Sequence, residues 1–246
     1  MTRDEVSQLE EMNFNAWPAL KTVHYDGWLL RCTGGASRRP NSVNCIAPST
    51  IALNEKIDKA AAFYARWQQR LVFRLTPLAD DGLDRILDQR GHAIEEPTFV
   101  QVSNIDPKPV PADVQVFTAV SDAWIAAALE IRGLTQDEAA IFAMQHRTVG
   151  VDSAWVLIKV NERPAAVGVA ALERGWAGLH GIYVAKGVRR RGLARKVSEA
   201  LLGFGYAHGA RRAWLQVAGA NAPALALYHS LGFRNAYSYH HRVGLK

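Results

Sequence analysis

The chain has 246 residues, of which 49% are hydrophobic and 21% charged, and its formal net charge is +6 at pH 7. This composition is typical of a globular enzyme, and the length suits one large domain or two small ones. No apolar run approaches the roughly 18 residues of a membrane-spanning helix, and the polar, acidic first residues are unlike a signal peptide. We therefore expect a cytoplasmic protein with no membrane partner.

The cysteines argue against a disulfide-rich or metal-binding protein, and the distribution of basic residues argues against a nucleic-acid-binding protein. Cys32 and Cys45 are too few for a disulfide framework and have no metal-ligand spacing with the histidines, so we expect no metal. The basic residues are mostly scattered arginines without interleaved aromatic residues, so we expect no nucleic acid partner. One basic cluster, at 189–191, would instead attract a small anionic ligand.

The first hundred residues predict a small α/β half. Residues 27–44 predict a hairpin with a polar loop. The elements expected after it are a helix over 54–69, a strand over 71–75, a helix over 83–89 and a strand over 99–102. Three prolines within residues 107–112 predict a linker at the end of this half.

The residues after the linker predict a longer alternation of strands and helices. In chain order these are a strand over 114–118, helices over 122–131 and 136–146, strands over 155–160, 165–172 and 176–184, a helix from 193 to Gly209, a strand over 213–217, a helix between Asn221 and Gly232, and a strand over 237–243. Only short turns separate the three central strands, which predicts an antiparallel meander.

The segment from Val184 to Ala194 joins the meander to an amphipathic helix. It is short and basic, and it ends at Gly192. The backbone N–H groups of such a loop can converge on an anion, and the helix that follows adds its unpaired N–H groups and the positive end of its dipole. The segment therefore predicts a pyrophosphate site, although it matches neither a dinucleotide fingerprint nor a P-loop.

Two motifs in this half resemble those of the GCN5-related N-acetyltransferase (GNAT) family. Arg189, Gly192 and Ala194 match the family's Arg/Gln-x-x-Gly-x-Gly/Ala loop. The family's second motif, Asn-x-x-Ala-x-x-x-Tyr-x-x-x-Gly-Phe, is matched by Asn221, Ala224, Tyr228, Gly232 and Phe233. The motifs occur in the right order, separated by one helix and one strand, and the resemblance covers residues 113–246.

The resemblance implies an α/β fold (α+β in some schemes), with a mixed, mostly antiparallel central sheet flanked by helices. The catalytic GNAT domain would be 113–246, after the linker at 107–112. The helix–strand–helix–strand order of the first half echoes that of residues 193–243, so we expect a tandem GNAT protein whose smaller first domain, 1–106, is a degenerate copy. No matching Arg-x-x-Gly-x-Ala loop precedes the long helix of that copy, so we expect no coenzyme A there.

The resemblance also implies an acyltransferase that moves an acetyl group from acetyl-CoA to a primary amine by direct attack in a ternary complex. The loop would hold the pyrophosphate of this co-substrate, and an open strand edge would bind the amides of its pantetheine arm. A backbone N–H near Val184 would stabilise the oxyanion. The residues implied in binding acetyl-CoA are Ile182, Tyr183, Val184, Arg189, Arg190, Arg191, Gly192, Leu193, Ala194, Asn221 and Tyr228.

Three side chains are candidates for proton transfer. Tyr228 matches the position of the family's general acid, because a tyrosine with a pKa of about 10 is protonated at neutral pH and can donate to the departing thiolate. A packed core aromatic is the alternative interpretation of this residue. His180 resembles a base in the arylalkylamine branch, although a second histidine of that branch is replaced here by Gly178. Glu173 and a water relay are the other options for the base.

The acceptor is expected to be a small-molecule or peptide amine, which the motifs do not specify. Four residues of the polar loop resemble a signature of tandem members and are candidate acceptor contacts: Arg38, Arg39, Asn41 and Ser42. Fixed donors at these positions would suit a carboxylate or phosphate, and a loop without this role is the alternative. A catalytically inactive CoA-binding sensor is the alternative function, and a homodimer is compatible with the sequence.

Overall fold

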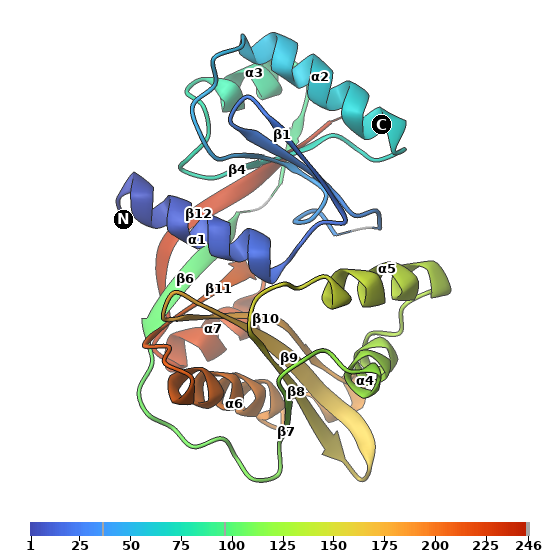
Figure 1. Ribbon diagram of the computed structural model, residues 1–246, viewed down its shortest axis with the longest axis vertical. Helices are drawn as coiled ribbons and strands as arrows, with labels where there is room; N and C mark the ends of the chain where they lie inside the picture. Colours follow the sequence, from blue (N-terminus) through green and yellow to red (C-terminus); the bar gives the residue numbers. More distant parts are fainter. Residues whose placement is uncertain (36, 96, 245–246) are drawn as a thin grey trace. The chain divides into compact units, whose positions relative to one another are not determined.

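The computed structural model describes residues 1–35, 37–95 and 97–244. These residues fall into two compact units that exchange segments of the chain (Figure 1). Unit 1 contains the described residues of 1–100, 217–222 and 235–244, and unit 2 contains 101–216 and 223–234. The last strand of the chain therefore belongs mainly to unit 1, which also contains the first hundred residues.

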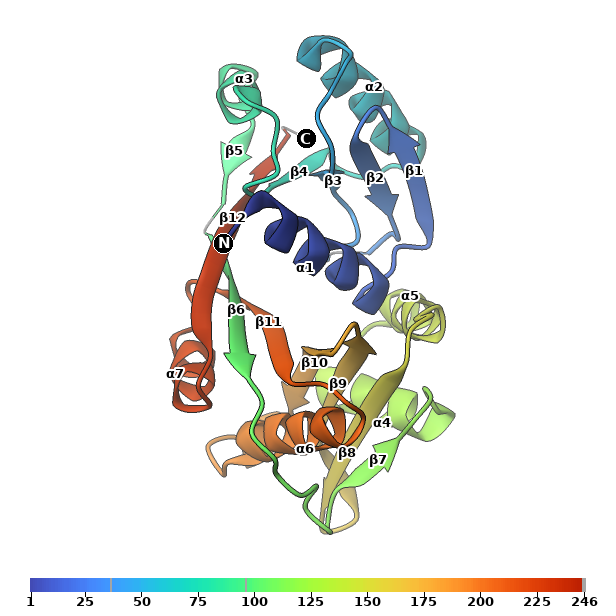
Figure 2. The same cartoon turned by 60° about the vertical axis from the view of Figure 1, so that its left-hand side comes forward.

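Unit 1 combines helices with mostly short strands, whose labels are shown in Figures 1 and 2. Its elements are α1 (Arg3–Ala16), β1 (Lys21–Tyr25), β2 (Trp28–Cys32), β3 (Val43–Cys45), α2 (Leu53–Arg66), β4 (Val72–Leu75), α3 (Leu83–Gln89), β5 (Ala93–Ile94) and β12 (Arg234–Val243, in this unit from Asn235). The strands pair in the order β1-β2-β3-β4-β12, and β5 also pairs with β12. The pairing of β3 with β4 is parallel, and the others are antiparallel.

The core of unit 1 follows from the helical spacing of α2. Ile57, Ala60 and Tyr64 are buried on one face of this helix, as the periodicity of the sequence predicts. They cluster with strand residues that include Trp28 and Phe73, whose rings meet edge to face at 5.5 Å. The sheet and α2 therefore share one apolar core.

Unit 2 contains the elements that the sequence predicts after the linker. They are β7 (Gln115–Phe117), α4 (Asp122–Arg132), α5 (Gln136–Arg147), β8 (Ser153–Val160), β9 (Arg163–Glu173), β10 (Trp176–Val184), the 3₁₀ turn η1 (Lys186–Val188), α6 (Leu193–Ala207), β11 (Arg212–Ala218) and α7 (Ala222–Ser230). A further strand, β6 (Thr98–Asn104), has residues in both units, and β11 and α7 also cross the division.

The sheet of unit 2 has helices on both faces. Its strands pair in the order β11-β10-β9-β8-β7, antiparallel except for β10 with β11. On β9, Val167 and Val169 point into the cluster formed with α4 and α5. The residue between them, Gly168, points to the opposite face, where an added Cβ would lie 2.4 Å from the side chain of Val197 on α6. The expected fold, a mostly antiparallel sheet flanked by helices, is confirmed.

The structural units and the sequence-based boundaries divide the chain differently at its C-terminal end. Residues 113–246 are expected in one domain, whereas β12 lies in unit 1 because its residues 240–243 pair with β4.

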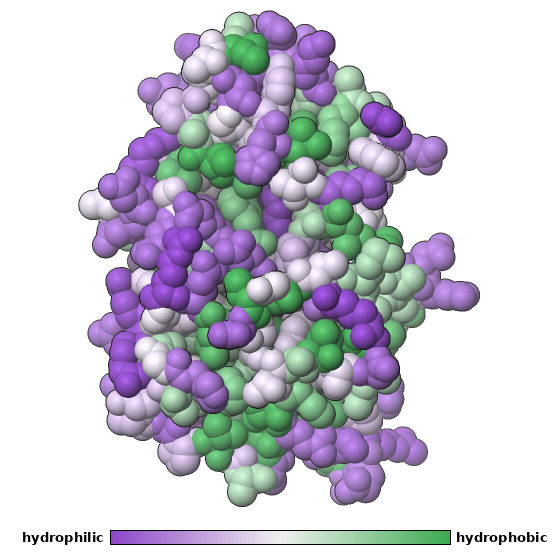
Figure 3. Space-filling model, viewed as in Figure 1, coloured by the Kyte–Doolittle hydropathy of each residue, from purple (hydrophilic) through white to green (hydrophobic). Residues whose placement is uncertain are grey.

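No helix in the described ranges is long and apolar enough to cross a membrane. On the face drawn in Figure 3, hydrophilic residues are interspersed with separate groups of apolar ones.

Candidate functional site

Strand β10 continues beyond its parallel neighbour and changes course as it does so. The pairing with β11 joins Trp176–Leu179 to Arg212–Leu215, and β10 then runs on to Val184. In its pairing with β9, one extra residue of β10 lies between His180 and Tyr183, and Gly181 there has φ +60°. Residues 180–184 are half-buried. We call these five residues the open edge of β10, because β11 no longer covers their side of the strand.

The loop that leaves the open edge has the backbone form of an anion site. It comprises residues 185–192 and is called here the anion loop; the turn η1 begins it, and α6 follows it. Two of its residues adopt left-handed conformations, Arg190 (φ +66°) and Gly192 (φ +77°), as in backbone nests that bind anions. Gly192 caps α6 without any side-chain hydrogen bond, and the first turn of α6 contains no acidic residue. The helix N–H groups at this end are therefore not satisfied by a capping side chain.

The space and the charges around the anion loop suit a phosphorylated ligand. A Cβ added at Gly192 would meet nothing within 4 Å, so the space on that side of its α-carbon is open. Lys186, Arg190 and Arg191 are exposed, and no ion pair is recorded for them within the described parts of the chain. The Nε of Arg189 donates to the carbonyl oxygen of Val184 (3.3 Å), which links the loop to the open edge. The loop thus presents cations and backbone donors together.

Helix α7 and the first turn of α6 are neighbours within unit 2. The side chain of Arg195 on α6 donates to the hydroxyl of Ser230 on α7. Helix α7 ends as expected: the N–H groups of Gly232 and Phe233 bond to the carbonyls of His229 (3.1 Å) and Tyr228 (3.0 Å), and Gly232 has φ +92°.

Tyr228 itself is half-buried, and its ring lies 5.9 Å from that of Phe233. The contact between α6 and α7 places the helix that contains Tyr228 beside the helix that the anion loop caps. Asn221 directly precedes α7, as the motif predicts, and falls in unit 1 by the structural division.

The two candidate bases lie on neighbouring strands, His180 on β10 and Glu173 at the end of β9. His180 is the first residue of the open edge and is half-buried. Glu173 pairs with Trp176 at the opposite end of the strand and contacts Arg174 (3.2 Å). At about 3.3 Å per residue, Trp176 and Val184 are roughly 26 Å apart. The structure therefore brings His180 to the open edge and leaves Glu173 at the far hairpin, beside a pocket of about 530 Å³.

Two of the four polar-loop residues of unit 1 hold the loop itself. The side-chain oxygen of Asn41 accepts from the N–H groups of Thr33 (2.7 Å) and Gly34 (2.9 Å), and its amide donates to two carbonyls of the same loop (3.0 and 2.7 Å). The hydroxyl of Ser42, a fully buried residue, donates to the carbonyl of Arg39 (3.2 Å). Because both amide hydrogens of Asn41 are used, the geometry gives this residue a structural role.

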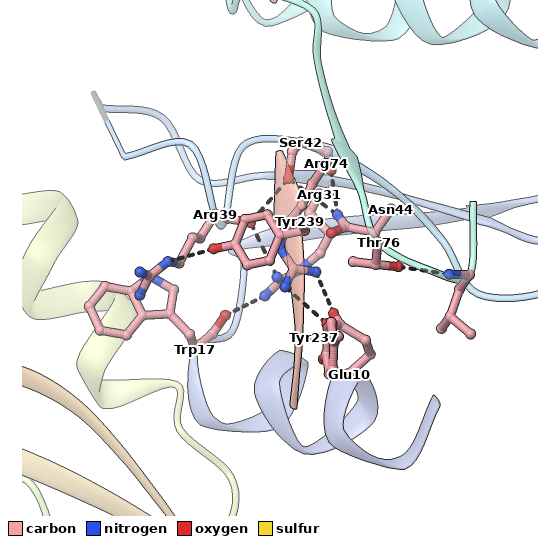
Figure 4. A network of polar contacts seen from close by, with 11 residues as sticks. Glu10, Trp17, Arg31, Arg39, Ser42, Asn44, Arg74, Thr76, Tyr237 and Tyr239 are labelled. Atoms are coloured by element: carbon pink, nitrogen blue, oxygen red, sulfur yellow. Dashed lines mark hydrogen bonds and ion pairs between the residues drawn. The ribbon is translucent and has the colours of Figure 1, made fainter. Parts of the chain in front are cut away.

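The other two, Arg38 and Arg39, also contact their own unit. Arg38 pairs with Glu95, and the Nε of Arg39 donates to the hydroxyl of Tyr239 (3.2 Å; Figure 4). The ring of Tyr239 in turn lies 3.7 Å from the guanidinium carbon of Arg74, which is fully buried and pairs with Glu10. Arg39 is therefore at the margin of a buried polar network.

Sequence reasoning did not include two features of this site. One is the bulge at Gly181, which a glycine inside a strand pattern could have indicated. The other is Arg132 at the end of α4, whose guanidinium carbon lies 4.6 Å from the ring centre of Tyr183. No local pattern in the sequence indicates this second contact, because it joins residues that are distant in the chain. No group of three or more potential metal-ligating side chains occurs among the residues that the structure describes.

A family model described as "Probable histone acetyltransferase Rv0428c C-terminal" matches residues 3–244 of this chain. The uncharacterized N-acetyltransferase YobR of Bacillus subtilis (strain 168) is 24% identical over 246 residues, 98% of this chain and 99% of YobR. A solved GCN5-related N-acetyltransferase from Kribbella flavida has a TM-score of 0.68 at 19% identity, covering 99% of this chain and 95% of its own. A tandem GNAT protein from the clavulanic acid biosynthesis pathway has a TM-score of 0.64 at 15% identity, with coverages of 99% and 88%.

The structural likenesses establish the fold, and the family model spans nearly the whole chain. The expected family is confirmed, while the expected degenerate origin of the first half stays a prediction. The chain belongs to the GCN5-related N-acetyltransferase family, in the group described as probable histone acetyltransferase Rv0428c C-terminal, and it is an acetyltransferase.

Proposed function

We propose that the protein transfers the acetyl group of acetyl-CoA to a primary amine by direct attack in a ternary complex. The observation that supports this most is the direct continuation of the open edge of β10 into the anion loop. An extended thioester arm and a pyrophosphate need these two kinds of surface in this order. The sensor alternative has no observation of its own in favour of it.

The residues present fit coenzyme A. The anion loop and the first turn of α6 supply backbone N–H groups for the pyrophosphate, and Gly192 leaves room for it to approach. Lys186, Arg190 and Arg191 supply positive charge for the phosphates. The backbone of residues 180–184 supplies donors and acceptors for the amides of the pantetheine arm.

The bond changes assign roles to the backbone and to two side chains. The amine nitrogen attacks the thioester carbonyl carbon, and the backbone N–H of Val184 stabilises the developing oxyanion. The carbon–sulfur bond then breaks, and Tyr228 donates its proton to the departing thiolate. His180, on the open edge, accepts the proton that the amine loses. Glu173 is left out of this scheme because it lies at the end of β9, beside the start of β10 and away from Val184.

The acceptor is an amine of a small molecule or a peptide. The groups that recognise the acceptor would lie next to the open edge, because its amine must reach the thioester there.

Gly192→Ala tests the proposed coenzyme A site. The variant places a Cβ in the open space of the loop and strains a left-handed residue, so we expect the Kd for coenzyme A to rise at least about tenfold in calorimetry. Gly209→Ala is the matched control, because Gly209 also has a positive φ (+91°) and open space but follows the opposite end of α6. Equal effects of the two substitutions on the Kd would argue against the assignment.

A further inference from the structure

Arg132, the last residue of α4, lies against the open edge of β10. Its guanidinium carbon is 4.6 Å from the ring centre of Tyr183 and 4.9 Å from that of Phe142 on α5. These distances are typical of cation–π contacts. Because Tyr183 directly precedes Val184, the contact holds a positive charge beside the strand on which the acetyl group is proposed to lie.

The side-chain contacts found for Arg132 within the described ranges are with aromatic rings. In the described ranges, neither an ion pair nor a hydrogen bond is recorded for its side chain, which is half-buried. Aromatic rings contact the face of a guanidinium, whereas its five N–H groups point outward in its plane. Arg132 is therefore a fixed cation with donors that can take a planar anion in a two-pronged contact.

Two titratable side chains of α5 interact electrostatically with Arg132, namely Glu138 and His146. Glu138, in the first turn of α5, accepts from the backbone N–H and the hydroxyl of Thr135 (both 3.0 Å). Asp122 lies at the opposite end of α4 from Arg132 and pairs with Arg147. His146 on α5 is neutral, because burial lowers its pKa to about 4. The hydrogen bonds from Thr135, and after them the charge of Arg132, lower the pKa of Glu138. Arg132 therefore has one acidic neighbour, but no carboxylate forms an ion pair with it in the described ranges.

We propose that Arg132 is a specificity-determining residue that selects acceptor amines with a carboxylate close to the amino group. The inference rests on the proposed acetyl transfer, because it assumes that the acceptor amine approaches the open edge. An Arg at the end of a helix also stabilises the helix dipole. Arg147 holds the same place at the end of α5, so it provides the matched control for that general effect.

The test compares amino acids with their α-carboxamides as acceptors, using glycine, alanine, phenylalanine and glutamate. We expect the full chain to prefer the acids in kcat/KM by at least about tenfold, as for a charge-assisted contact. Arg132→Gln should remove this preference through KM, and Arg132→Lys should restore it only in part because lysine lacks the planar fork. Arg147→Gln should keep the preference.

Two controls separate this inference from the proposed function. Calorimetry on the same preparations should give the same Kd for coenzyme A in every variant. If the unmodified chain does not bind coenzyme A, that result contradicts the proposed function and not the role of Arg132. Saturation-transfer NMR of the acids and amides with the protein–coenzyme A complex measures acceptor binding independently of turnover. An acid-to-amide ratio near one in the unmodified chain, or an unchanged ratio in Arg132→Gln, would overturn the role of Arg132.

Discussion

At the scale of single residues, Tyr228 has the strongest support as the proton donor of the proposed reaction. The sequence motif places it on the right helix, and the structure shows that none of the residues of α7 is fully buried. Tyr228 is half-buried, so it is not a fully buried core residue, although its ring contacts Phe233. This exposure is what a group that must reach a bound thiolate requires.

Replacing Tyr228 by Phe removes the hydroxyl and keeps the ring contact with Phe233. We expect kcat to fall by about 100-fold, since positioned acids contribute at least that much, while the Kd for acetyl-CoA stays within about twofold. The measurement is thiol release at saturating acetyl-CoA with any amine that is turned over. His229→Phe, on the exposed neighbouring position, should change neither value. A fall of less than about threefold in Tyr228→Phe would leave Tyr228 with packing alone.

The residue scale also shows which roles a sequence can predict. The form of the anion loop was predictable because it depends on local signals, namely a glycine, a helix start and basic residues within one short segment, while its role in binding an anion stays a prediction. The hydrogen bonds of Asn41 were not, because an amide with the same local pattern can either donate to a ligand or close its own loop. Only the positions of the carbonyl groups around it decide between the two.

At the scale of elements, helix α1 was not predicted from the sequence, and its contacts show what stabilises it. Thr2 and Glu5 form a reciprocal capping box, and Val6, Leu9 and Met12 are buried on one face. The capping box and the apolar spacing are both present in the sequence, but the segment is mostly polar and acidic and was therefore not assigned as a helix. The helix is further held by Glu10, which accepts hydrogen bonds from Arg74 and from the hydroxyl of Tyr237 (2.5 Å; Figure 4).

Glu10→Gln should destabilise unit 1 by leaving Arg74 without its counter-charge. Both side chains are almost fully buried, so we expect the free energy of unfolding to fall by about 3 kcal/mol. Glu11→Gln, on the exposed neighbouring position of α1, is the control and should change stability by less than about 0.5 kcal/mol. Urea denaturation followed by circular dichroism measures both. Equal stabilities of the two variants would show that the ion pair does not anchor the helix.

At the scale of the whole molecule, the sequence predicts the element types better than their grouping. The periodicity of each half is local, so nearly all elements of unit 2 are where the sequence places them. The pairing of β12 with β4 joins residues more than 150 positions apart, and no local pattern specifies such a partner. A linker such as the Pro-rich segment at 107–112 divides the chain at one point. The two structural units cannot be separated in that way, because unit 1 also contains segments from the C-terminal half. The duplication, the homodimer and the cytoplasmic location stay predictions.

Hydrogen–deuterium exchange of the full chain, with and without acetyl-CoA, tests the central claim most directly, because the proposed site consists largely of backbone N–H groups. The account predicts slower exchange in two adjoining segments, the open edge at 180–184 and the anion loop with the first turn of α6 at 185–196. Peptides from the β9–β10 hairpin at 173–176 should be unchanged. Unchanged exchange over 180–196 at saturating acetyl-CoA, or protection confined to unit 1, would contradict the account.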